Sequence, residues 1–267
     1  SNFNAGTLSL GSLIKIAEGI SAKLDFSTAT RMPTIDEQYL NGTSPSFPVM
    51  ARGRHDLGPE TSWSTSATLK LDYTWLKSEV SVYGSYIDDY IYLAPELRED
   101  GTVRTDVLIQ GRFPRFNYNA INAVYYGFDA EVQTRMGPIE LGLDGSVVRA
   151  FDVDLDSFLL FIPPDRTSVE LTYHLPELKS VKDSFISVNV SLIARQYSVS
   201  PDSDFAPVPD GYFLLGASAG TTFEWGDQRY LFSVETQNAL NTRYRDYTSL
   251  LRYFADEPGR QVFIRFG

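Results

Sequence analysis

The stretch WSTSATLKLDYTW, residues 63–75, alternates strictly between two kinds of side chain. Its odd positions are Trp, Thr, Ala, Leu, Leu, Tyr and Trp, and its even positions are Ser, Ser, Thr, Lys, Asp and Thr. A period of two places alternate side chains on opposite faces of a β-strand. The stretch therefore predicts one long strand with an apolar face and a polar face.

The two tryptophans at the ends of this stretch indicate what the apolar face contacts. Twelve steps of ~3.3 Å span roughly 40 Å, or ~28 Å across a layer at ~45° tilt. That height is close to the distance between the two aromatic girdles of a transmembrane β-barrel. Strands in soluble proteins are usually shorter, at ~5–6 residues. The pattern favours an all-β, antiparallel transmembrane barrel.

The same alternation returns along the whole chain and predicts eleven strands, at residues 7–17, 20–28, 63–75, 80–86, 124–135, 139–144, 169–175, 186–192, 213–225, 230–234 and 262–266. Bacterial single-chain barrels close with an even number of strands. We therefore expect this chain to supply about eleven strands of a larger barrel.

The predicted connections alternate in length. The short ones lie near residues 17–19, 76–78, 136–138, 176–182 and 226–228, and the long ones near 29–62, 93–120, 151–166, 198–211 and 243–259. Such an alternation places all short turns at one end of the sheet and all long loops at the other. Outer-membrane barrels have short periplasmic turns and long external loops.

The composition excludes several other classes of protein. The 267 residues contain no Cys and 2 His, which excludes a disulfide scaffold, an iron–sulfur protein and a thiolate zinc site. A net charge of −11 argues against a nucleic-acid binder, whose usual footprint is basic. We find no nucleophile elbow, phosphate loop or dinucleotide motif, and we expect no catalytic residues, metal site or cofactor.

Five ordered segments resemble TonB-dependent outer-membrane receptors. The segment at 26–42 is similar to their R-x-P…E-L-Y-x-N-G stretch through Arg31, Pro33, Glu37, Tyr39, Asn41 and Gly42. The other four are LGPETSW at 57–63, YYGFDAEVQ at 125–133, VETQNALNTRYRDY at 234–247 and PGRQVFIRFG at 258–267.

The resemblance implies a 22-stranded barrel of which residues 1–267 are the C-terminal part, with the plug domain absent from this chain. It implies active uptake of a scarce solute, such as a ferric siderophore or another metal chelate, driven by TonB through the plug. The implied location is the outer membrane of a Gram-negative bacterium, in contact with lipid and lipopolysaccharide. A passive porin-like channel and an outer-membrane rim enzyme stay open as alternatives. The chain starts at Ser1 without a basic-then-apolar leader, so we expect either a cleaved leader or a start within a longer protein.

We predict that the loops at 29–62 and 243–259 converge above the lumen and contact the solute. Basic and aromatic side chains are dense there in an otherwise acidic chain, and a basic mouth would concentrate an anionic chelate. The predicted substrate-binding residues are Arg31, Tyr39, Arg52, Arg54, His55, Arg243, Arg245 and Arg252. For Arg31, Glu37 and Tyr39, the alternative is a structural knot that orders the loop, and for the arginine-rich 243–252 segment it is contact with lipopolysaccharide phosphates.

Other polar residues favour structural interpretations. His55 with Asp56 supplies too few ligands to specify a metal, which favours a solvated loop. Asp88 and Asp89 are predicted to point to opposite faces, which argues against a joint catalytic role. The predicted lumen-facing residues carry mixed charges and indicate ion-pair ladders, at Lys15, Lys23, Asp25, Lys70, Asp72, Glu131, Arg135, Glu140, Asp144, Glu170, His174 and Arg195.

Overall fold

The structure, a computed structural model, describes residues 5–44, 47–109, 111–178, 181–200, 204–225 and 228–267. Its elements are β1 (Thr7–Ala17), β2 (Ile20–Arg31), α1 (Ile35–Tyr39), β3 (Asn41–Ser44), β4 (Phe47–Arg52), β5 (Glu60–Asp72), β6 (Leu76–Pro95), β7 (Thr105–Leu108), β8 (Gly111–Met136), β9 (Ile139–Asp152), β10 (Ser157–Phe158), β11 (Arg166–His174), β12 (Val181–Ile193), β13 (Tyr212–Trp225), β14 (Gln228–Gln237), the 3-10 helix η1 (Leu250–Tyr253) and β15 (Gln261–Phe266). In this described part of the chain, no helix has the length and apolar character needed to cross a bilayer.

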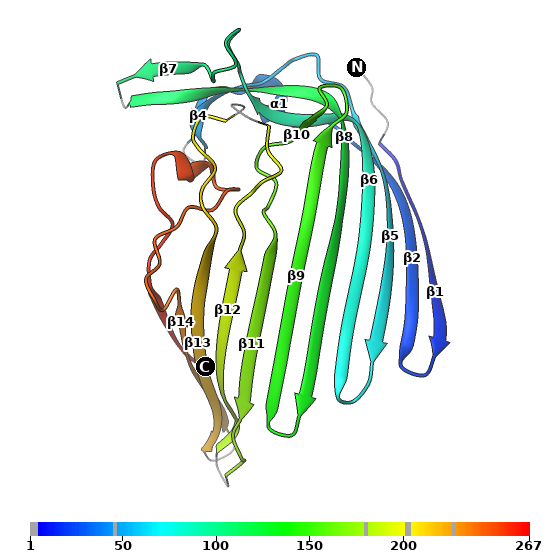
Figure 1. Cartoon of the computed structure of the whole chain (residues 1–267), viewed down its shortest axis with the longest axis vertical. Helices are drawn as coiled ribbons and strands as arrows, with labels where there is room; N and C mark the ends of the chain where they lie inside the picture. The colour runs from blue at the N-terminus through cyan, green and yellow to red at the C-terminus, as the bar shows by residue number, and fades with distance from the viewer. Residues whose placement is uncertain (1–4, 45–46, 110, 179–180, 201–203, 226–227) are drawn as a thin grey trace.

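Eleven strands form one continuous antiparallel path, in the order β1-β2-β5-β6-β8-β9-β11-β12-β13-β14-β15. Each is the counterpart of a predicted strand, so the predicted all-β fold is confirmed. Figure 1 shows the strands as a curved wall, with short turns at its lower end and long connections at its upper end. We call this upper end the mouth; it is formed by the connections at 32–59, 96–110, 153–165, 194–211 and 238–260.

Several predicted strand boundaries were wrong, and two of these differences have a clear origin. The strand predicted at 63–75 runs from Glu60 to Asp72, and Trp75 lies in the following turn. The strand ends there because the N–H of Tyr73 donates to the carbonyl of Leu76 and closes the turn. The long connection predicted at 93–120 is mostly strand, because β6 extends to Pro95 and β8 begins at Gly111.

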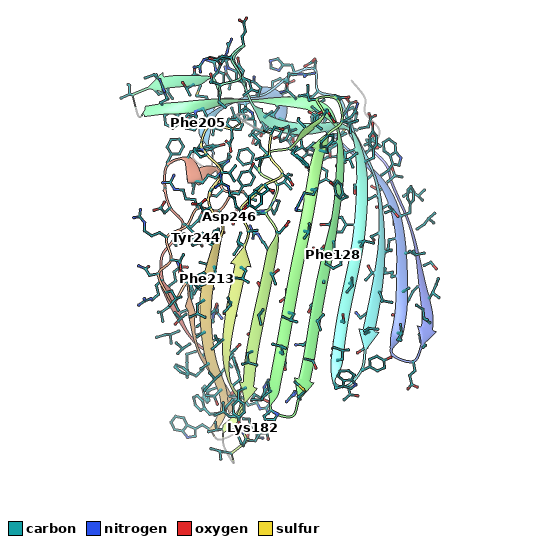
Figure 2. All side chains as sticks on the ribbon, in the orientation of Figure 1. Phe128, Lys182, Phe205, Phe213, Tyr244 and Asp246 are labelled. Atoms are coloured by element: carbon teal, nitrogen blue, oxygen red, sulfur yellow. The ribbon has the colours of Figure 1, made fainter. Side chains whose placement is uncertain are left out.

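The outer face of the wall is apolar, as the alternation predicts. Leu69 of β5, Leu143 of β9 and Leu171 of β11 are all exposed, and Leu71 and Leu141 are half-buried. Figure 2 shows side chains lining the wall along its whole height, with Phe128 and Phe213 between the mouth and the lower end. An exposed apolar surface of this extent fits contact with lipid rather than with water.

The inner face carries some of the predicted ion pairs. Lys23 pairs with Asp25 at 2.8 Å, and Lys70 of β5 pairs with Glu79 of β6 at 3.2 Å. His174 of β11 lies 3.0 Å from a carboxylate oxygen of Glu140 on β9.

A long hairpin of β6 and β8 bends over the mouth (Figure 1). Its register shifts between Ile87 and Tyr90, and Asp89 has a φ of 52°. The simple alternation predicted for Asp88 and Asp89 therefore does not hold, because a bulge re-aims the chain at this point.

Two small buried clusters lie where the long connections meet the wall. Ala123, Ala150, Leu159 and Ile162 form the first, which packs the 153–165 connection against β8 and β9. Val49, Ala51 and Phe116 form the second, with Leu250 and Tyr253 packed against it. The connections at 32–59 and 238–260 therefore converge at the mouth, as predicted.

Replacing Gly127 with Val is expected to impair assembly of the sheet. An added Cβ at Gly127 would collide with the Tyr83 ring on the neighbouring strand and would lie 2.6 Å from the carbonyl oxygen of Val147. Overpacking of this kind costs about 1–3 kcal/mol. The matched control is Gly145→Val, because an added Cβ at Gly145 meets nothing within 4 Å. The fraction of protein that keeps a folded-barrel mobility on unheated gels measures the effect, and equal fractions for the two variants would contradict it.

Candidate functional site

Arg31 joins three elements at the edge of the mouth. Its guanidinium donates to both carboxylate oxygens of Glu37 on α1, at 3.0 and 2.9 Å, and to Glu60 of β5 at 2.9 Å. Burial opposes ionisation of Glu37, but hydrogen bonds from Arg31 and Thr34 outweigh it, so the pKa of Glu37 lies below its usual value. These contacts favour the structural knot over substrate contact as the interpretation of Arg31 and Glu37.

Glu60 connects this knot to the bent hairpin. The same carboxylate oxygen that receives Arg31 also accepts the backbone N–H of Ile91 at 3.0 Å. Ile91 lies beyond the last pair of the β5–β6 ladder, Thr61 with Asp88, and pairs with Ala120 on its β8 side. A side chain thus supplies the acceptor that a regular ladder would have supplied.

The neighbouring loop places Tyr39, Arg52, Arg54 and His55 near one another. The rings of Tyr39 and His55 lie 4.9 Å apart, and the Nε of Arg54 donates to Asp56 at 2.8 Å. Arg52 is exposed at the end of β4, and no carboxylate of the described residues lies within salt-bridge distance of it. Among those residues no group of three or more His, Cys, Asp or Glu side chains could hold a metal ion. The solvated loop predicted for His55 and Asp56 stays a prediction.

Arg243 and Arg245 share one carboxylate. Arg243 donates to Asp256 at 2.7 Å, and Arg245 donates to the other oxygen of Asp256 at 2.7 Å. These hydrogen bonds, that of Arg245 first, hold the pKa of Asp256 below its usual value. The positive charge predicted for this loop is therefore partly balanced within the loop.

Arg252 is not on the surface at all. It is 1% exposed, and its guanidinium lies 4.7 Å from the ring centres of Tyr247 and Tyr253 and 5.5 Å from that of Phe161. Asp204 is its ion-pair partner and also accepts the hydroxyl of Tyr253 at 2.5 Å. The Nε and Nη1 atoms of Arg252 have no hydrogen-bond partner in the part of the chain that the structure describes.

The aromatic surroundings of Arg252 are themselves constrained. Burial raises the pKa of Tyr247 to about 12, so its hydroxyl stays protonated at neutral pH. Phe161 adopts a φ of 62°, a conformation that costs a non-glycine residue about 1–3 kcal/mol. The sequence pattern contained no signal for Asp204 or Phe161, because both become neighbours of Arg252 only through the folding of separate connections.

A second polar network joins the 238–260 connection of the mouth to the upper ends of β11 and β13. Asp246 accepts hydrogen bonds from Arg166 at 2.8 Å and from the hydroxyl of Tyr212 at 3.0 Å. The rings of Tyr212 and Tyr244 lie 4.4 Å apart, and Figure 2 shows Tyr244 and Asp246 at the upper end of the wall. Burial acts against ionisation of Asp246, but hydrogen bonds from Thr248 and the charge of Arg166 keep its pKa below the usual value.

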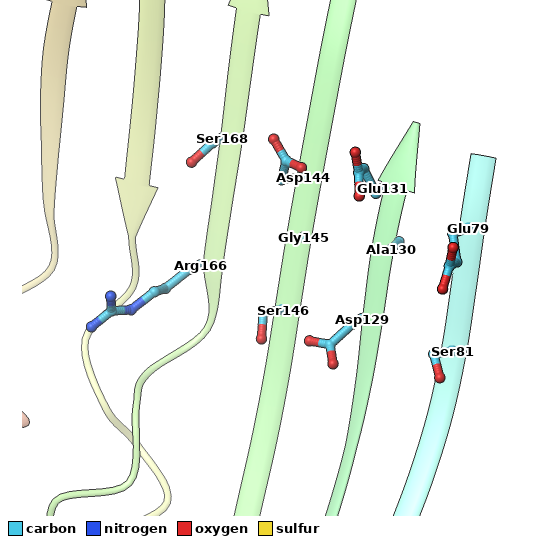
Figure 3. A pocket seen from close by; sticks show the side chains of 10 residues that line it. All are labelled: Glu79, Ser81, Asp129, Ala130, Glu131, Asp144, Gly145, Ser146, Arg166 and Ser168. Atoms are coloured by element: carbon cyan, nitrogen blue, oxygen red, sulfur yellow. The ribbon is translucent and has the colours of Figure 1, made fainter. Parts of the chain in front are cut away.

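The inner wall also carries an acidic groove of about 500 Å³, shown in Figure 3. Glu79, Asp129, Glu131 and Asp144 line it from three adjacent strands, and Arg166 lies at its end. The alternation along the strands predicts Glu131 and Asp144 on the lumen face but not this local segregation of negative charge. Register decides it, because the pairing of Glu79 with Glu131 and of Glu131 with Asp144 aligns the carboxylates across the sheet.

The eight predicted substrate-binding residues therefore do not form one set. Arg31, Arg54, Arg243, Arg245 and Arg252 all have carboxylate partners, and Tyr39, Arg52 and His55 form an exposed group beside α1.

Removing the charge of Asp204 is expected to loosen the mouth. The Asp204→Asn variant leaves the Arg252 guanidinium without its counter-charge, and breaking a buried pair in this way costs about 3–5 kcal/mol. The side chain of Asp204 is 9% exposed, whereas that of Asp210 in the same connection is 90% exposed and pairs with Arg195. Asp210→Asn is therefore the matched control. The rate of backbone hydrogen exchange at 247–254 should rise in Asp204→Asn and stay at the wild-type value in Asp210→Asn. Equal rates in the two variants would show that the buried Arg252–Asp204 pair does not hold this segment in place.

Comparison with known proteins is consistent with this architecture. A family model described as "TonB dependent receptor-like, beta-barrel" matches residues 1–248. No curated protein matches the chain.

Solved structures share the fold. The copper transporter OprC superposes with a TM-score of 0.75 at 15% identity, over 97% of this chain and 38% of its own. The siderophore receptor PirA from Acinetobacter baumannii superposes with a TM-score of 0.65 at 16% identity, over 97% of this chain and 40% of its own. The FrpB iron transporter from Neisseria meningitidis (F3-3 variant) superposes with a TM-score of 0.65 at 13% identity, over 97% of this chain and 38% of its own. The chain thus spans about two fifths of the length of these proteins. Because the family model covers most of its residues, the chain belongs to the TonB-dependent receptor-like β-barrel family.

Proposed function

We propose that this chain forms part of the wall and mouth of an outer-membrane receptor that takes up a scarce solute, driven by TonB. The observation that carries the proposal is the family match over residues 1–248, on a sheet whose eleven main strands follow one another without a crossover. The solute class proposed is a ferric siderophore or a similar metal chelate. Proteins of the same fold are described as a copper transporter, a siderophore receptor and an iron transporter, which supports this class.

The proposed location is the outer membrane of a Gram-negative bacterium. The apolar outer face supports contact with lipid, and the arginine-rich mouth supports contact with lipopolysaccharide phosphates. β1 and β15 each pair with one neighbour on the eleven-strand path, so each leaves an open edge. We propose that the missing N-terminal barrel half pairs with these edges, and that a plug which binds TonB faces the polar inner wall.

Arg52, Tyr39 and His55 are proposed as the first residues to meet the solute. Their side chains are exposed at the mouth. In the described part of the chain Arg52 makes no salt bridge, and Asp106, which pairs with Arg115, interacts with Arg52 only through its charge. The five other predicted arginines would reach an anionic solute only by exchanging a carboxylate for it.

Uptake in cells that produce the full-length receptor tests the proposal. Labelled iron is supplied as a hydroxamate, catecholate or citrate chelate, and labelled copper as the ion. At least one of these solutes should accumulate about tenfold more than in cells lacking the gene, and a protonophore should abolish the difference.

Two results would overturn this assignment. Uptake that persists with the protonophore would identify a passive channel, an alternative that the acidic groove in Figure 3 favours for cations. No accumulation of any solute tried would remove the chelate class.

Replacing Arg52 with Ala is expected to raise the half-saturating concentration of an anionic chelate about fivefold. This corresponds to the roughly 1 kcal/mol of an exposed charge pair, and added salt should shrink the difference. The control is Arg229→Ala, because Arg229 is an equally exposed arginine on β14 that pairs with Glu224 at the lower end of the wall. A half-saturating concentration that responds equally to both variants would exclude Arg52 as a contact.

A further inference from the structure

A cavity of about 440 Å³ lies at the mouth between the bent hairpin and two other connections. The hairpin contributes Tyr90, Tyr92 and Tyr118, and β8 also contributes Tyr125. Phe161 and Leu250 come from the opposite side, each from a different connection. The cavity is thus assembled from three segments that are far apart in the sequence.

The lining of this cavity contains no ionisable acid, lysine, arginine or histidine. It consists of four tyrosines, one phenylalanine, five aliphatic side chains and Thr248. The acidic groove farther down the wall has the opposite character, because four of the ten residues that line it are carboxylates. The two hollows therefore suit chemically different groups.

The neutrality of the cavity is maintained by its surroundings. Arg252 lies against the ring of Phe161, one of the lining residues, and its charge is compensated by Asp204. Arg245 donates to the carbonyl of Arg252 at 2.7 Å and to Asp256, so it is also directed away from the cavity. A charged ligand group entering here would lose its hydration without gaining a partner of opposite charge.

Aromatic geometry and hydrogen-bonding capacity define what the cavity can hold. The rings of Tyr90 and Tyr125 meet edge to face, with centres 5.6 Å apart, and those of Tyr90 and Tyr92 lie nearly parallel at 6.1 Å. The hydroxyl oxygen of Tyr92 accepts the N–H of Leu160 at 2.8 Å, and a phenol hydroxyl can also donate one hydrogen bond. Such a site offers ring faces and edges together with a phenol donor.

We propose that this tyrosine-lined cavity binds an uncharged aromatic group that carries a hydroxyl or carbonyl oxygen, as one end of the transported solute. The proposal rests on the proposed uptake function and narrows its substrate class: the group bound under the hairpin is neutral, and any anionic part of the solute stays at the exposed rim near Arg52. The Tyr118 ring forms the hairpin side of the cavity, and the Leu250 side chain faces it from η1.

Direct binding to the purified full-length receptor in detergent tests the proposal. The probes are 1-naphthol, which is neutral and aromatic, 1-naphthoate, which is anionic, and decahydro-1-naphthol, which is neutral but not aromatic. Titration calorimetry should show 1-naphthol binding at least tenfold more tightly than either of the other two probes.

Variants assign the binding to this cavity. Tyr118→Ala removes one side of the cavity and Leu250→Trp fills its space. Each substitution should lower the affinity for 1-naphthol about tenfold. Tyr118→Phe keeps the aromatic ring and should lower the affinity for 1-naphthol no more than about threefold. Tyr126→Ala is the control, because Tyr126 lies on the same strand, is 50% exposed and is absent from the cavity lining.

The binding results test the cavity proposal separately from the transport proposal. Binding of 1-naphthoate as tight as that of 1-naphthol, or wild-type affinity in both Tyr118→Ala and Leu250→Trp, would overturn the cavity assignment even if energised uptake is observed. Selective 1-naphthol binding that these two variants weaken would support the cavity, even if the uptake assay fails and the transport proposal is abandoned.

Discussion

Backbone hydrogen bonding between neighbouring strands is the constraint on which the rest of this structure depends. Lipid cannot hydrogen-bond the backbone N–H and carbonyl groups of a sheet that it surrounds. Each strand must therefore form these hydrogen bonds with its neighbouring strands. Eleven strands meet this demand by pairing in sequence order. Beyond the last β5–β6 pair, Thr61 with Asp88, the carboxylate of Glu60 accepts the N–H of Ile91, and Arg31 donates to that same carboxylate. One ion-pair network therefore joins β2, α1 and β5 to the base of the bent hairpin.

Charge at the mouth is organised by pairing rather than by excess. The sequence contains many arginines in the external connections, but most of them face a carboxylate: Arg31 meets Glu37 and Glu60, and Arg243 and Arg245 share Asp256. These pairs order long connections that contain little regular structure. They also leave the upper cavity neutral, while the carboxylates on β6, β8 and β9 make the inner wall below it acidic.

The strands could be predicted because their signal is local. Alternation over as few as five residues, as at 230–234, was enough to locate β14 within Gln228–Gln237. Boundaries were predicted less well, because a strand ends where a turn bond forms: the alternation continues to Trp75, but the turn bond between Tyr73 and Leu76 ends β5 at Asp72. The hairpin was missed for the same reason. Residues 90–95 pair with 116–121 beyond the bulge, and their pattern alone does not report a change of direction.

The sequence by itself determined the number and order of the main strands, which face of each is apolar, and the end of the sheet at which the long connections gather. It could do so because a period of two and the position of turn residues are properties of short segments. Only the tertiary structure decided which carboxylate neutralises which arginine, that Arg252 is buried among Phe161, Tyr247 and Tyr253 rather than exposed, and that four tyrosines line one cavity. Those contacts join residues from separate connections, and their geometry is set by how the connections pack over the mouth, for which no periodic pattern exists.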